Sequence, residues 1–335
     1  MKIKAYASRA PSSRLEPWSY ELTPPAPHEV VIKVLACGLC HSDLSMMKNA
    51  WGMTAYPLVP GHEVVGEVLE LGDGVQHLKR GDRVGVGWQR SACLSCRDCL
   101  NGNENLCSQS GGTIVQHHGG FAEQVKVDGR FAFALPAGLD TDVTGPLLCG
   151  GLTVYSGLKH AGMTHGKEVG VIGIGGLGHL AVQFAAKLGN RVTVFTTSPE
   201  KAEFASRLGA HRAVLTHGGL PKELTESFDI LLNTVNVGQD WNAYLSLLRA
   251  DGVLSFVGVP PDPLNVPVFL LLGKRRRIMA SPIGSRAEIT EMLKLAQDFQ
   301  IQPIIERFPM ENINDALAKL EKNEIRYRAV LTQAG

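Results

Sequence analysis

The sequence predicts an α/β protein in which a β-rich region is followed by a parallel, doubly wound sheet. From residue 167 onward, short apolar runs alternate with helix-like segments, a pattern typical of parallel strands joined by crossover helices. Before that point, short β-branched runs are separated by Pro, Gly and Asp turns, which indicates strands with few helices. A chain of 335 residues is long enough to bury two substantial cores.

The β-rich region contains four predicted strands. They cover residues 30–35, 64–69, 83–86 and 121–127. The segment Lys-Arg-Gly-Asp at residues 79–82 is predicted to be a turn between two of these strands. We expect the first domain to span residues 1–146.

A glycine-rich turn joins the first strand of the second region to its first helix. The apolar run 169–174 leads into the turn, and the helix-like segment 179–188 follows it. The turn has the pattern G-x-G-x-x-G and includes Gly173, Gly175, Gly176, Leu177 and Gly178. Such glycines allow a tight turn and close approach of a pyrophosphate, which the positive end of the helix attracts. We interpret the turn as the dinucleotide fingerprint of a Rossmann domain, and a turn that serves only packing is the alternative.

The alternation of strand and helix continues beyond this turn. Strands are predicted at 191–197, 213–216, 228–235 and 252–259, and helices at 200–208 and 241–248. A helix at 286–299, a strand at 304–308, a helix at 312–320 and a strand at 326–331 do not extend the alternation regularly. We therefore expect a cofactor-binding domain over residues 147–283, followed by a segment, 284–335, that returns to the first domain.

Composition and charge exclude several classes of protein. With 33 Lys and Arg against 32 Asp and Glu, the chain has no general attraction to nucleic acid or anionic membranes. The start, MKIKAYASRA, lacks the apolar core of a signal peptide, and no apolar run has transmembrane length. We therefore expect a cytoplasmic protein. In that compartment, seven cysteines favour metal or redox chemistry over disulfides.

Four cysteines lie close together in a polar loop. Cys93, Cys96, Cys99 and Cys107 have spacings that suit tetrahedral coordination of zinc by four thiolates. A redox pair or free surface thiols are the alternatives. Because four cysteines leave no vacant coordination position, we interpret this predicted zinc site as structural.

A second set of potential ligands is scattered along the chain. It comprises Cys40, His62 and Cys149, which could form a catalytic zinc site with two sulfurs, one nitrogen and an open position. Spacing alone does not show that these residues converge, and a buried Cys or an isolated His is more often structural.

Taken together, the motifs resemble those of the zinc-dependent medium-chain alcohol dehydrogenases. The segments CGLCHSD, PGHEVVG, the four-cysteine loop, GPLLCGG and the glycine fingerprint occur in that family's order over essentially the whole chain. The sequence is most similar to the cinnamyl-alcohol-dehydrogenase-like branch and its bacterial NADPH-dependent aldehyde reductases. This resemblance implies a GroES-like catalytic domain that includes the final segment, two zinc ions per chain, and a catalytic zinc held by Cys40, His62 and Cys149 in a cleft between the domains.

The resemblance also implies roles for the neighbours of these ligands. Glu63 corresponds to a carboxylate beside the zinc, and Asp43 to the partner that orients His62, although an ordinary turn carboxylate is the alternative. Ser42 lies where the family has the hydroxyl that exchanges a proton with the substrate, and it could also be a helix N-cap. The family often has a His five residues after Cys40, where this chain has Ser45, so the proton route beyond Ser42 is open.

Further positions correspond to cofactor and substrate contacts of the family. His41 and Arg328 match residues that contact the cofactor phosphates, and Thr153 matches one that packs at the nicotinamide. Trp51 and Trp88 fall where bulky side chains shape the substrate pocket. Solvated basic residues and ordinary core aromatics are the respective alternatives.

The end of the second Rossmann strand predicts NADP(H) as the cofactor. An NAD site has a carboxylate there that binds the ribose hydroxyls, whereas this strand ends at Thr196 with no Asp or Glu. Hydroxyls of Thr196, Thr197 and Ser198 could bind a 2′-phosphate, and Lys201 could neutralise its charge. Helix capping before Pro199 is the alternative explanation for the hydroxyls.

These inferences predict a zinc-dependent enzyme that transfers a hydride between NADP(H) and an aliphatic or aromatic primary alcohol or aldehyde. Zinc polarises the oxygen, the nicotinamide carries the hydride and Ser42 delivers the proton. An NAD-dependent polyol or formaldehyde-type dehydrogenase is a close alternative. A distant one is a zinc-ribbon module that binds nucleic acid through Lys274, Arg275, Arg276 and Arg277, where a solvated turn is more plausible. The resemblance implies a homodimer or homotetramer.

Overall fold

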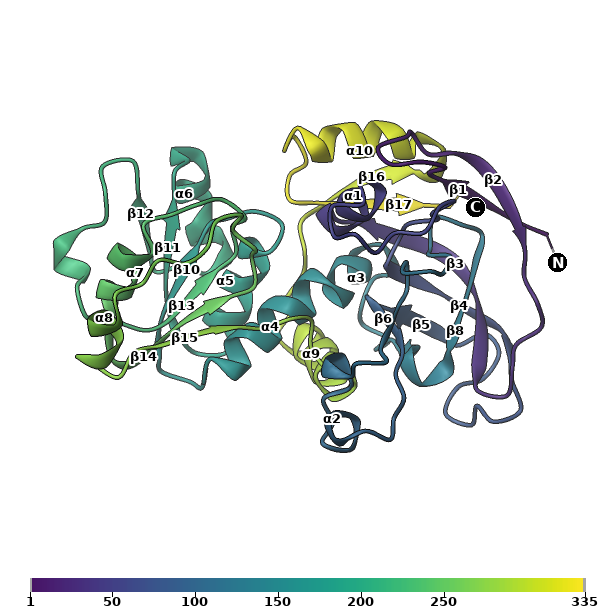
Figure 1. The fold of residues 1–335 in the computed structure, drawn as a ribbon, viewed down its shortest axis with the longest axis horizontal. Coiled ribbons are helices and arrows are strands. Elements are labelled where there is room, and N and C mark those ends of the chain that lie inside the picture. Colours follow the sequence, from purple (N-terminus) through teal and green to yellow (C-terminus); the bar gives the residue numbers. More distant parts are fainter. Residues whose placement is uncertain (1, 334–335) are drawn as a thin grey trace. The chain divides into compact units, whose positions relative to one another are not determined.

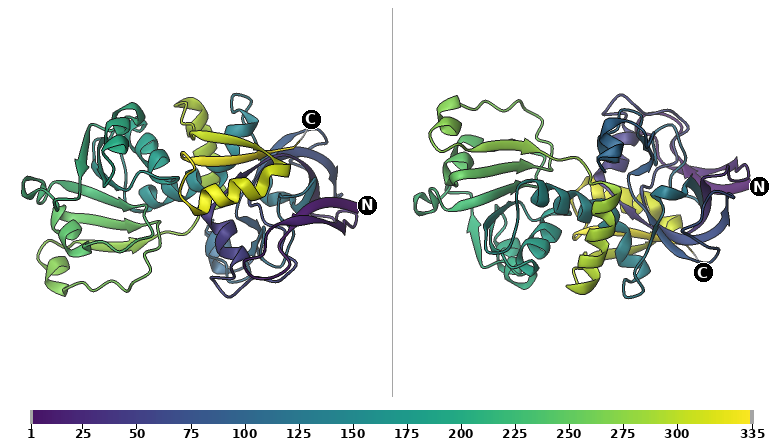
Figure 2. Two further views of the ribbon diagram at one scale, coloured as in Figure 1. Left: turned by 90° about the horizontal axis from the view of Figure 1, so that it is seen from above. Right: turned by 90° about the horizontal axis from the view of Figure 1, so that it is seen from below.

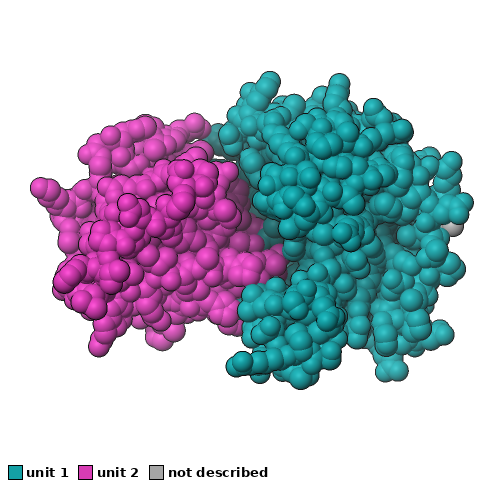
Figure 3. Space-filling view, in the orientation of Figure 1, with its two compact units in different colours: residues 1–149, 285–297, 302–335 teal, residues 150–284, 298–301 magenta. Residues whose placement is uncertain are grey.

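The computed structural model describes residues 2–333, which divide into two compact units (Figure 3). Unit 1 comprises residues up to 149 together with 285–297 and those from 302 onward, and unit 2 comprises residues 150–284 and 298–301. The chain therefore leaves unit 1 after residue 149, returns at residue 285, and leaves it again briefly over residues 298–301. Among the described residues, no helix has both the length and the apolar character needed to cross a bilayer.

Unit 1 is built on a seven-stranded sheet (Figure 1). The order is β16 (Ile305–Pro309), β17 (Arg328–Thr332), β3 (Glu29–Leu39), β4 (Glu63–Leu71), β5 (Arg83–Val86) and β9 (Phe133–Ala134), with β8 (Gln124–Asp128) also pairing with β3. Two smaller sheets pair β1 (Lys2–Ala7) with β2 (Glu16–Glu21), and β6 (Gln89–Ser91) with β7 (Gly111–Gly112). The C-terminal strand β17 thus pairs with β3 from the first part of the chain.

Short helices surround this sheet. They are α1 (His41–Met47), α2 (Arg97–Leu100), α3 (Thr141–Thr144), α9 (Arg286–Asp298) and α10 (Ile313–Glu321), with 3₁₀ turns η1 (Glu104–Leu106), η2 (Gly129–Phe131), η3 (Gly145–Leu148) and η6 (Met310–Asn312). The core includes apolar side chains of the sheet and of α10, such as Ile32, Val64 and Leu317, together with Phe121, which precedes β8. Its β-branched residues fit the pleated surfaces of paired strands.

Unit 2 is a six-stranded parallel sheet with helices on both faces (Figure 2). The order is β12 (Arg212–Leu215), β11 (Arg191–Thr196), β10 (Glu168–Ile172), β13 (Phe228–Asn233), β14 (Leu248–Phe256) and β15 (Arg277–Ala280). The connecting elements are α4 (Gly150–His160), α5 (Gly178–Lys187), α6 (Pro199–Ala205), α7 (Trp241–Leu247) and α8 (Val268–Leu272), with η4 (Ser206–Leu208) and η5 (Lys222–Leu224). This strand order is that of a Rossmann sheet, so the predicted fold class is confirmed.

Several predicted boundaries were wrong. The strand predicted from residue 121 begins at Gln124, because the backbone of Phe121 bonds to Pro60 and Tyr6 instead of β3. The strand predicted at 252–259 begins earlier, at Leu248, where the chain pairs with Phe228, and it ends at Phe256. The sequence did not predict β15, which starts within the basic run.

The N-terminus of α1 also differs from the prediction. Cys40 is the N-cap, and its backbone N–H donates to Asp43 Oδ2 over 3.0 Å. Ser42 is the second residue of the helix, so the interpretation of Ser42 as an N-cap was wrong. The Asp43 carboxylate closes the first turn and leaves the Ser42 hydroxyl available for another role.

Candidate active site

Four potential metal ligands converge in unit 1. One ligand atom each from Cys40, His62, Glu63 and Cys149 lies within 4.8 Å of all the others. Antiparallel pairing of β3 with β4 sets Gly38 opposite Glu63, which brings the segment after β3 and the start of β4 to the same end of the sheet. Cys149 enters at the end of η3.

Asp43 lies next to this cluster and contacts one of its ligands, His62. Its side chain is fully buried. The carboxylate oxygen Oδ1 accepts a hydrogen bond from the backbone N–H of Gly61 at 2.9 Å, and the same oxygen lies 3.0 Å from His62 Nδ1. With Nδ1 engaged in this way, Nε2 of His62 faces Cys149 Sγ at 3.4 Å. A carboxylate that holds one ring nitrogen while the other faces a ligand set is the usual support of a metal-binding histidine.

The pKa values within the cluster differ strongly from their usual ranges. A hydrogen bond from the Cys149 thiol lowers the pKa of Cys40 well below its usual range, and the same contact raises the pKa of Cys149. Burial opposes the charged form of His62, but the Asp43 carboxylate outweighs it and raises the pKa of the imidazole. The two neighbouring thiols thus favour different protonation states, and a cation that binds both sulfurs would compete with protons there.

Glu63 forms a buried ion pair with Arg328 of β17. Burial raises the pKa of Glu63 to about 7, against the opposing effect of the Arg328 charge. The other carboxylate oxygen, Oε2, is buried without a hydrogen-bond partner. A Cβ on Gly38 would lie 1.9 Å from this oxygen, so only glycine leaves room for the carboxylate. An unpartnered buried oxygen next to two sulfurs and an imidazole fits a site that holds a cation.

Two tryptophans stand next to the cluster. The Trp88 ring contacts the His62 ring edge to face, with centroids 5.1 Å apart, and Trp51 contacts Trp88 in the same manner at 5.8 Å. Trp51 is 47% exposed. The structure therefore places Trp88 beside a candidate ligand and Trp51 against Trp88.

The four cysteines of the polar loop also converge. Cys93 Sγ lies 3.8 Å from Cys99 Sγ and 3.5 Å from Cys107 Sγ, and all four sulfurs, including that of Cys96, lie within 4.8 Å of one another. A tetrahedron of sulfurs at ~2.3 Å from a zinc ion has edges of ~3.8 Å, so the spacing fits zinc. Backbone N–H groups of Ser95 and Cys96 lower the pKa of Cys93 to about 6, which favours a thiolate.

The glycine turn of unit 2 has the shape needed to receive a phosphate. A Cβ on Gly178 would lie 2.0 Å from the carbonyl oxygen of Gly173, and one on Gly173 would lie 2.3 Å from Val235 Cγ1. These glycines therefore permit close packing of strand and helix. A Cβ on Gly175 would meet no protein atom within 4 Å. Open space at that position, beside the N-terminus of α5, fits the approach of a pyrophosphate. Gly176 and Leu177 are half-buried in the same turn.

The end of β11 carries the hydroxyl cluster. Thr196 is buried, and its Oγ1 accepts a hydrogen bond from the Ser198 backbone N–H at 3.2 Å. Ser198 Oγ accepts one from the Lys201 N–H at 3.2 Å and so caps α6. Capping therefore accounts for one interaction of Ser198, whereas Thr197 and Lys201 are exposed.

The remaining predicted site residues lie at three places. His41 is exposed at the first position of α1, and Ser42 Oγ lies 3.8 Å from Cys40 Sγ. Ser45 is half-buried further along the same helix, and Thr153 is half-buried in α4 of unit 2. Of these residues, the structure brings only Ser42 against a candidate metal ligand.

Sequence reasoning missed two features of this centre. The first is the contact of Arg328 with Glu63, 265 residues away along the chain. Only tertiary pairing of β17 with β3 brings these residues together. Arg328 is buried, so the alternative of a solvated base was wrong for it, and its contact with the cofactor phosphates stays a prediction. The second is Gly38, whose missing side chain makes room for Glu63. Its position within the CGLC segment was a signal that could have indicated this role.

The basic run is occupied by internal contacts. Lys274 Nζ lies 3.0 Å from Glu226 Oε2, and Arg275 forms two hydrogen bonds with Asp251 at 2.9 and 2.7 Å. Arg276 donates to the carbonyl oxygens of Leu248 and Leu270, and Arg277 to that of Asp251. These contacts disfavour the run as a nucleic-acid surface. Residues 273–275 form a turn, and Lys274, Arg275 and Arg277 are exposed, so the predicted solvated turn is confirmed.

Models of two protein families match the chain. The alcohol dehydrogenase GroES-like domain matches residues 26–137, and the zinc-binding dehydrogenase model matches residues 176–298. An aldehyde reductase of Synechocystis is 45% identical over 333 residues, which cover 99% of both chains. A probable cinnamyl alcohol dehydrogenase of Pinus radiata is 40% identical over 343 residues, covering 99% of this chain and 96% of that protein.

Solved structures show the same similarity. A cinnamyl alcohol dehydrogenase of Sorghum bicolor superposes with a TM-score of 0.94 and 38% identity, covering 99% of this chain and 98% of its own. The corresponding enzyme of Helicobacter pylori, solved with NADP(H), superposes with a TM-score of 0.91 and 30% identity over the same shares.

Proposed function

The chain belongs to the zinc-dependent medium-chain alcohol dehydrogenases, in their cinnamyl-alcohol-dehydrogenase-like branch, and from this premise we propose that it is an NADP(H)-dependent aldehyde reductase and alcohol dehydrogenase. We propose unit 1 as its catalytic domain and unit 2 as its cofactor domain. The observation that carries the proposal is the convergence of Cys40, His62 and Cys149 beside an unpartnered carboxylate oxygen of Glu63.

The donor set of this centre fits zinc. Two sulfurs and an imidazole nitrogen match the catalytic zinc sites that keep an open position. When bound, the zinc ion supplies Lewis acidity toward an alcohol or aldehyde oxygen, and the nicotinamide supplies or accepts a hydride. We assign a second, structural zinc to Cys93, Cys96, Cys99 and Cys107, whose sulfur spacing supports it.

The chain's own residues orient the reaction and move its proton. Asp43 holds the His62 ring so that Nε2 faces the open centre. The Ser42 hydroxyl, next to Cys40, is placed to donate a proton during reduction and to accept one during oxidation. Arg328 neutralises Glu63, which lowers the free-energy cost of burying that carboxylate beside the ligands. Trp88 and Trp51 form an aromatic wall beside His62.

Three features support NADP(H) over NAD(H). No carboxylate stands at the end of β11, Thr197 and Lys201 are exposed there, and the Helicobacter pylori relative was solved with NADP(H). A carboxylate at this place would repel a 2′-phosphate, whereas hydroxyls and an ammonium group attract it. We assign His41 and Thr153 to the cofactor as well, at its phosphates and nicotinamide respectively.

We propose that the substrates are medium-sized unbranched or aromatic aldehydes and the corresponding primary alcohols. The aromatic wall of Trp51 and Trp88 favours a flat or extended substrate carrying one small group on the reacting carbon. The test is a panel of aldehydes and ketones assayed with NADPH and NADH. We expect the highest kcat/KM for aldehydes with NADPH. A preference for secondary ketones, or equal kcat/KM with the two cofactors, would contradict the assignment.

A further inference from the structure

Glu104 is a buried carboxylate within the loop of four cysteines. It begins η1, three residues before Cys107, and is 6% exposed. Its Oε1 lies 3.4 Å from Arg286 Nη1, and its Oε2 has no hydrogen-bond partner. Its backbone carbonyl oxygen accepts a hydrogen bond of 2.6 Å from Gln89 Nε2. One residue of the loop thus contacts two elements outside it.

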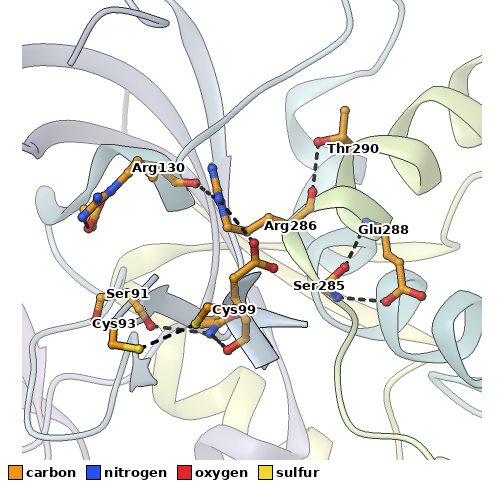
Figure 4. Close-up of polar contacts among 11 residues, drawn as sticks. Ser91, Cys93, Cys99, Arg130, Ser285, Arg286, Glu288 and Thr290 are labelled. Carbon is orange, nitrogen blue, oxygen red and sulfur yellow. Dashed lines mark hydrogen bonds and ion pairs between the residues drawn. The ribbon is translucent and has the colours of Figure 1, made fainter. Parts of the chain in front are cut away.

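The first of these elements is the start of α9, where the chain re-enters unit 1 (Figure 4). Arg286 donates to the Arg130 carbonyl oxygen at 2.8 Å, and its guanidinium lies 5.4 Å from the centre of the Phe131 ring. Ser285 and Glu288 cap the helix reciprocally, with distances of 2.9 and 3.4 Å. Beyond these contacts, Glu104 is the acidic partner of Arg286.

The second element is β6, which adjoins the aromatic wall. Gln89 is buried, and it directly follows Trp88, whose ring contacts His62. The residue before Trp88 also approaches α9, because Ile289 of α9 lies 3.9 Å from the position that a Cβ on Gly87 would take. Glu104 therefore connects the cysteine loop, to which it belongs, with the residues that lead to the candidate active site.

The contacts of Glu104 depend on the conformation of the cysteine loop, which a bound metal would fix. The loop is too polar to form its own core, so a bound metal fixes its conformation. If the metal leaves, η1 can move, which would separate the Glu104 carboxylate from Arg286 and the Glu104 carbonyl oxygen from Gln89. By reciprocity, contacts that favour the metal-bound conformation of the loop must also strengthen metal binding.

We propose that Glu104 is a positioning residue that couples metal occupancy of the cysteine loop to the start of α9 and to the strand behind Trp88. The inference rests on the proposed second zinc. The loop metal then has a role beyond local stability, because it holds the wall of the active site through Glu104 and Gln89.

The first test measures zinc release in the Cys149→Ala background, where zinc bound by the loop alone is counted. Glu104→Gln and Arg286→Gln should each release zinc to a chelator about tenfold faster than the background. The double variant should be no faster than the faster single variant, because both changes break the contact between Glu104 and Arg286. Arg307→Gln, which removes an exposed ion pair of unit 1, is the matched control and should leave the rate unchanged.

The second test uses hydrogen exchange and kinetics with Cys149 intact. Glu104→Gln should accelerate exchange at residues 286–292 and 88–91 but not in α10, and should raise KM for an aromatic aldehyde without changing kcat. Unchanged zinc release and unchanged exchange in Glu104→Gln and Arg286→Gln would overturn the inference, while activity of the unmodified enzyme would leave the proposed function standing. Absence of zinc from the Cys149→Ala background would overturn both the loop metal and this inference.

Discussion

Asp43 positions the candidate metal ligands, although it is not one of them. It closes α1, bonds the Gly61 backbone and orients His62, all from a fully buried position. Asp43→Asn should keep the fold but misorient the imidazole, lowering zinc retention or kcat about 10–100-fold. Metal analysis and steady-state rates measure this. Asp142→Asn, at a partly exposed ion pair, is the control, and equal zinc retention in the two variants would remove Asp43 from its proposed role.

Cofactor choice is also decided by single side chains. Thr196→Asp should weaken NADPH strongly and favour NADH relatively, because the new carboxylate repels a 2′-phosphate and can bind ribose hydroxyls. Lys201→Ala should raise KM for NADPH alone. Ser198→Ala separates the two explanations of that hydroxyl, because loss of the helix cap lowers stability by about 1 kcal/mol whether or not the hydroxyl binds phosphate. If Lys201→Ala raised KM equally for both cofactors, the phosphate assignment would be wrong.

His117 gives unit 1 a pH-dependent stability. Burial, assisted by the Arg90 charge, lowers the pKa of His117 to about 4, so the folded chain binds fewer protons than the unfolded chain in mildly acidic solution. Its contribution to stability is therefore present above pH ~6.5 and is lost as the pH falls toward 4. Between pH 7 and 5 the unmodified protein should lose about 2 kcal/mol more stability than His117→Gln in denaturant titrations. His28→Gln, at an exposed histidine of the same unit, is the control and should not reduce the loss.

At the scale of elements, different glycines of the turn serve different purposes: Gly178 permits close packing, and Gly175 leaves space for the cofactor. Gly178→Ala should lower the melting temperature, because its Cβ would collide with the Gly173 carbonyl oxygen and cost about 1–3 kcal/mol. Gly175→Ala meets no protein atom, so it should melt normally but raise KM for the cofactor severalfold. A cofactor KM unchanged in Gly175→Ala would indicate that the turn serves packing only.

Much of the fold could be predicted from the sequence because its signals are local. The β-branched runs that became β3, β4 and β5 and the glycine turn before α5 are contiguous patterns. The elements that were missed depend on distant partners. The strand β15 begins in a basic run whose charges are compensated by Glu226 and by Asp251 of β14. Arg328 lies against Glu63 only because β17 pairs with β3.

The sequence could predict which residues are candidate metal ligands, but not the buried contacts around them. The types and spacing of Cys93, Cys96, Cys99 and Cys107 already indicate zinc, whereas spacing alone left Cys40, His62 and Cys149 open until the family resemblance was considered. The burial of Asp43 and the unpartnered oxygen of Glu63 are properties of the folded environment, so no local pattern reveals them.

At the scale of the whole molecule, unit 2 exposes an apolar face on α8. No residue of α8 is buried, and Val268, Phe269 and Leu272 are 71%, 83% and 67% exposed. The neighbouring strand β15 is the edge of its sheet among the described residues, which leaves backbone groups free for pairing. We propose that this face forms the oligomer that the family resemblance implies.

Charge introduced on that face should dissociate the oligomer. Phe269→Glu with Leu272→Glu should shift the mass measured by analytical ultracentrifugation from an oligomer to a single chain. Leu215→Glu, at an exposed apolar residue of the opposite sheet edge, is the matched control and should leave the mass unchanged. An oligomer that persists in the double variant would locate the interface elsewhere.

The central claim is that Cys40, His62 and Cys149 hold a catalytic zinc distinct from the zinc of the four-cysteine loop. The most direct measurement is elemental analysis of the unmodified protein and of Cys149→Ala, combined with aldehyde reduction by NADPH. We expect about two zinc ions per chain in the unmodified protein, about one in the variant, a preserved circular dichroism spectrum and loss of turnover. A variant that keeps both zinc ions and its turnover would contradict the account.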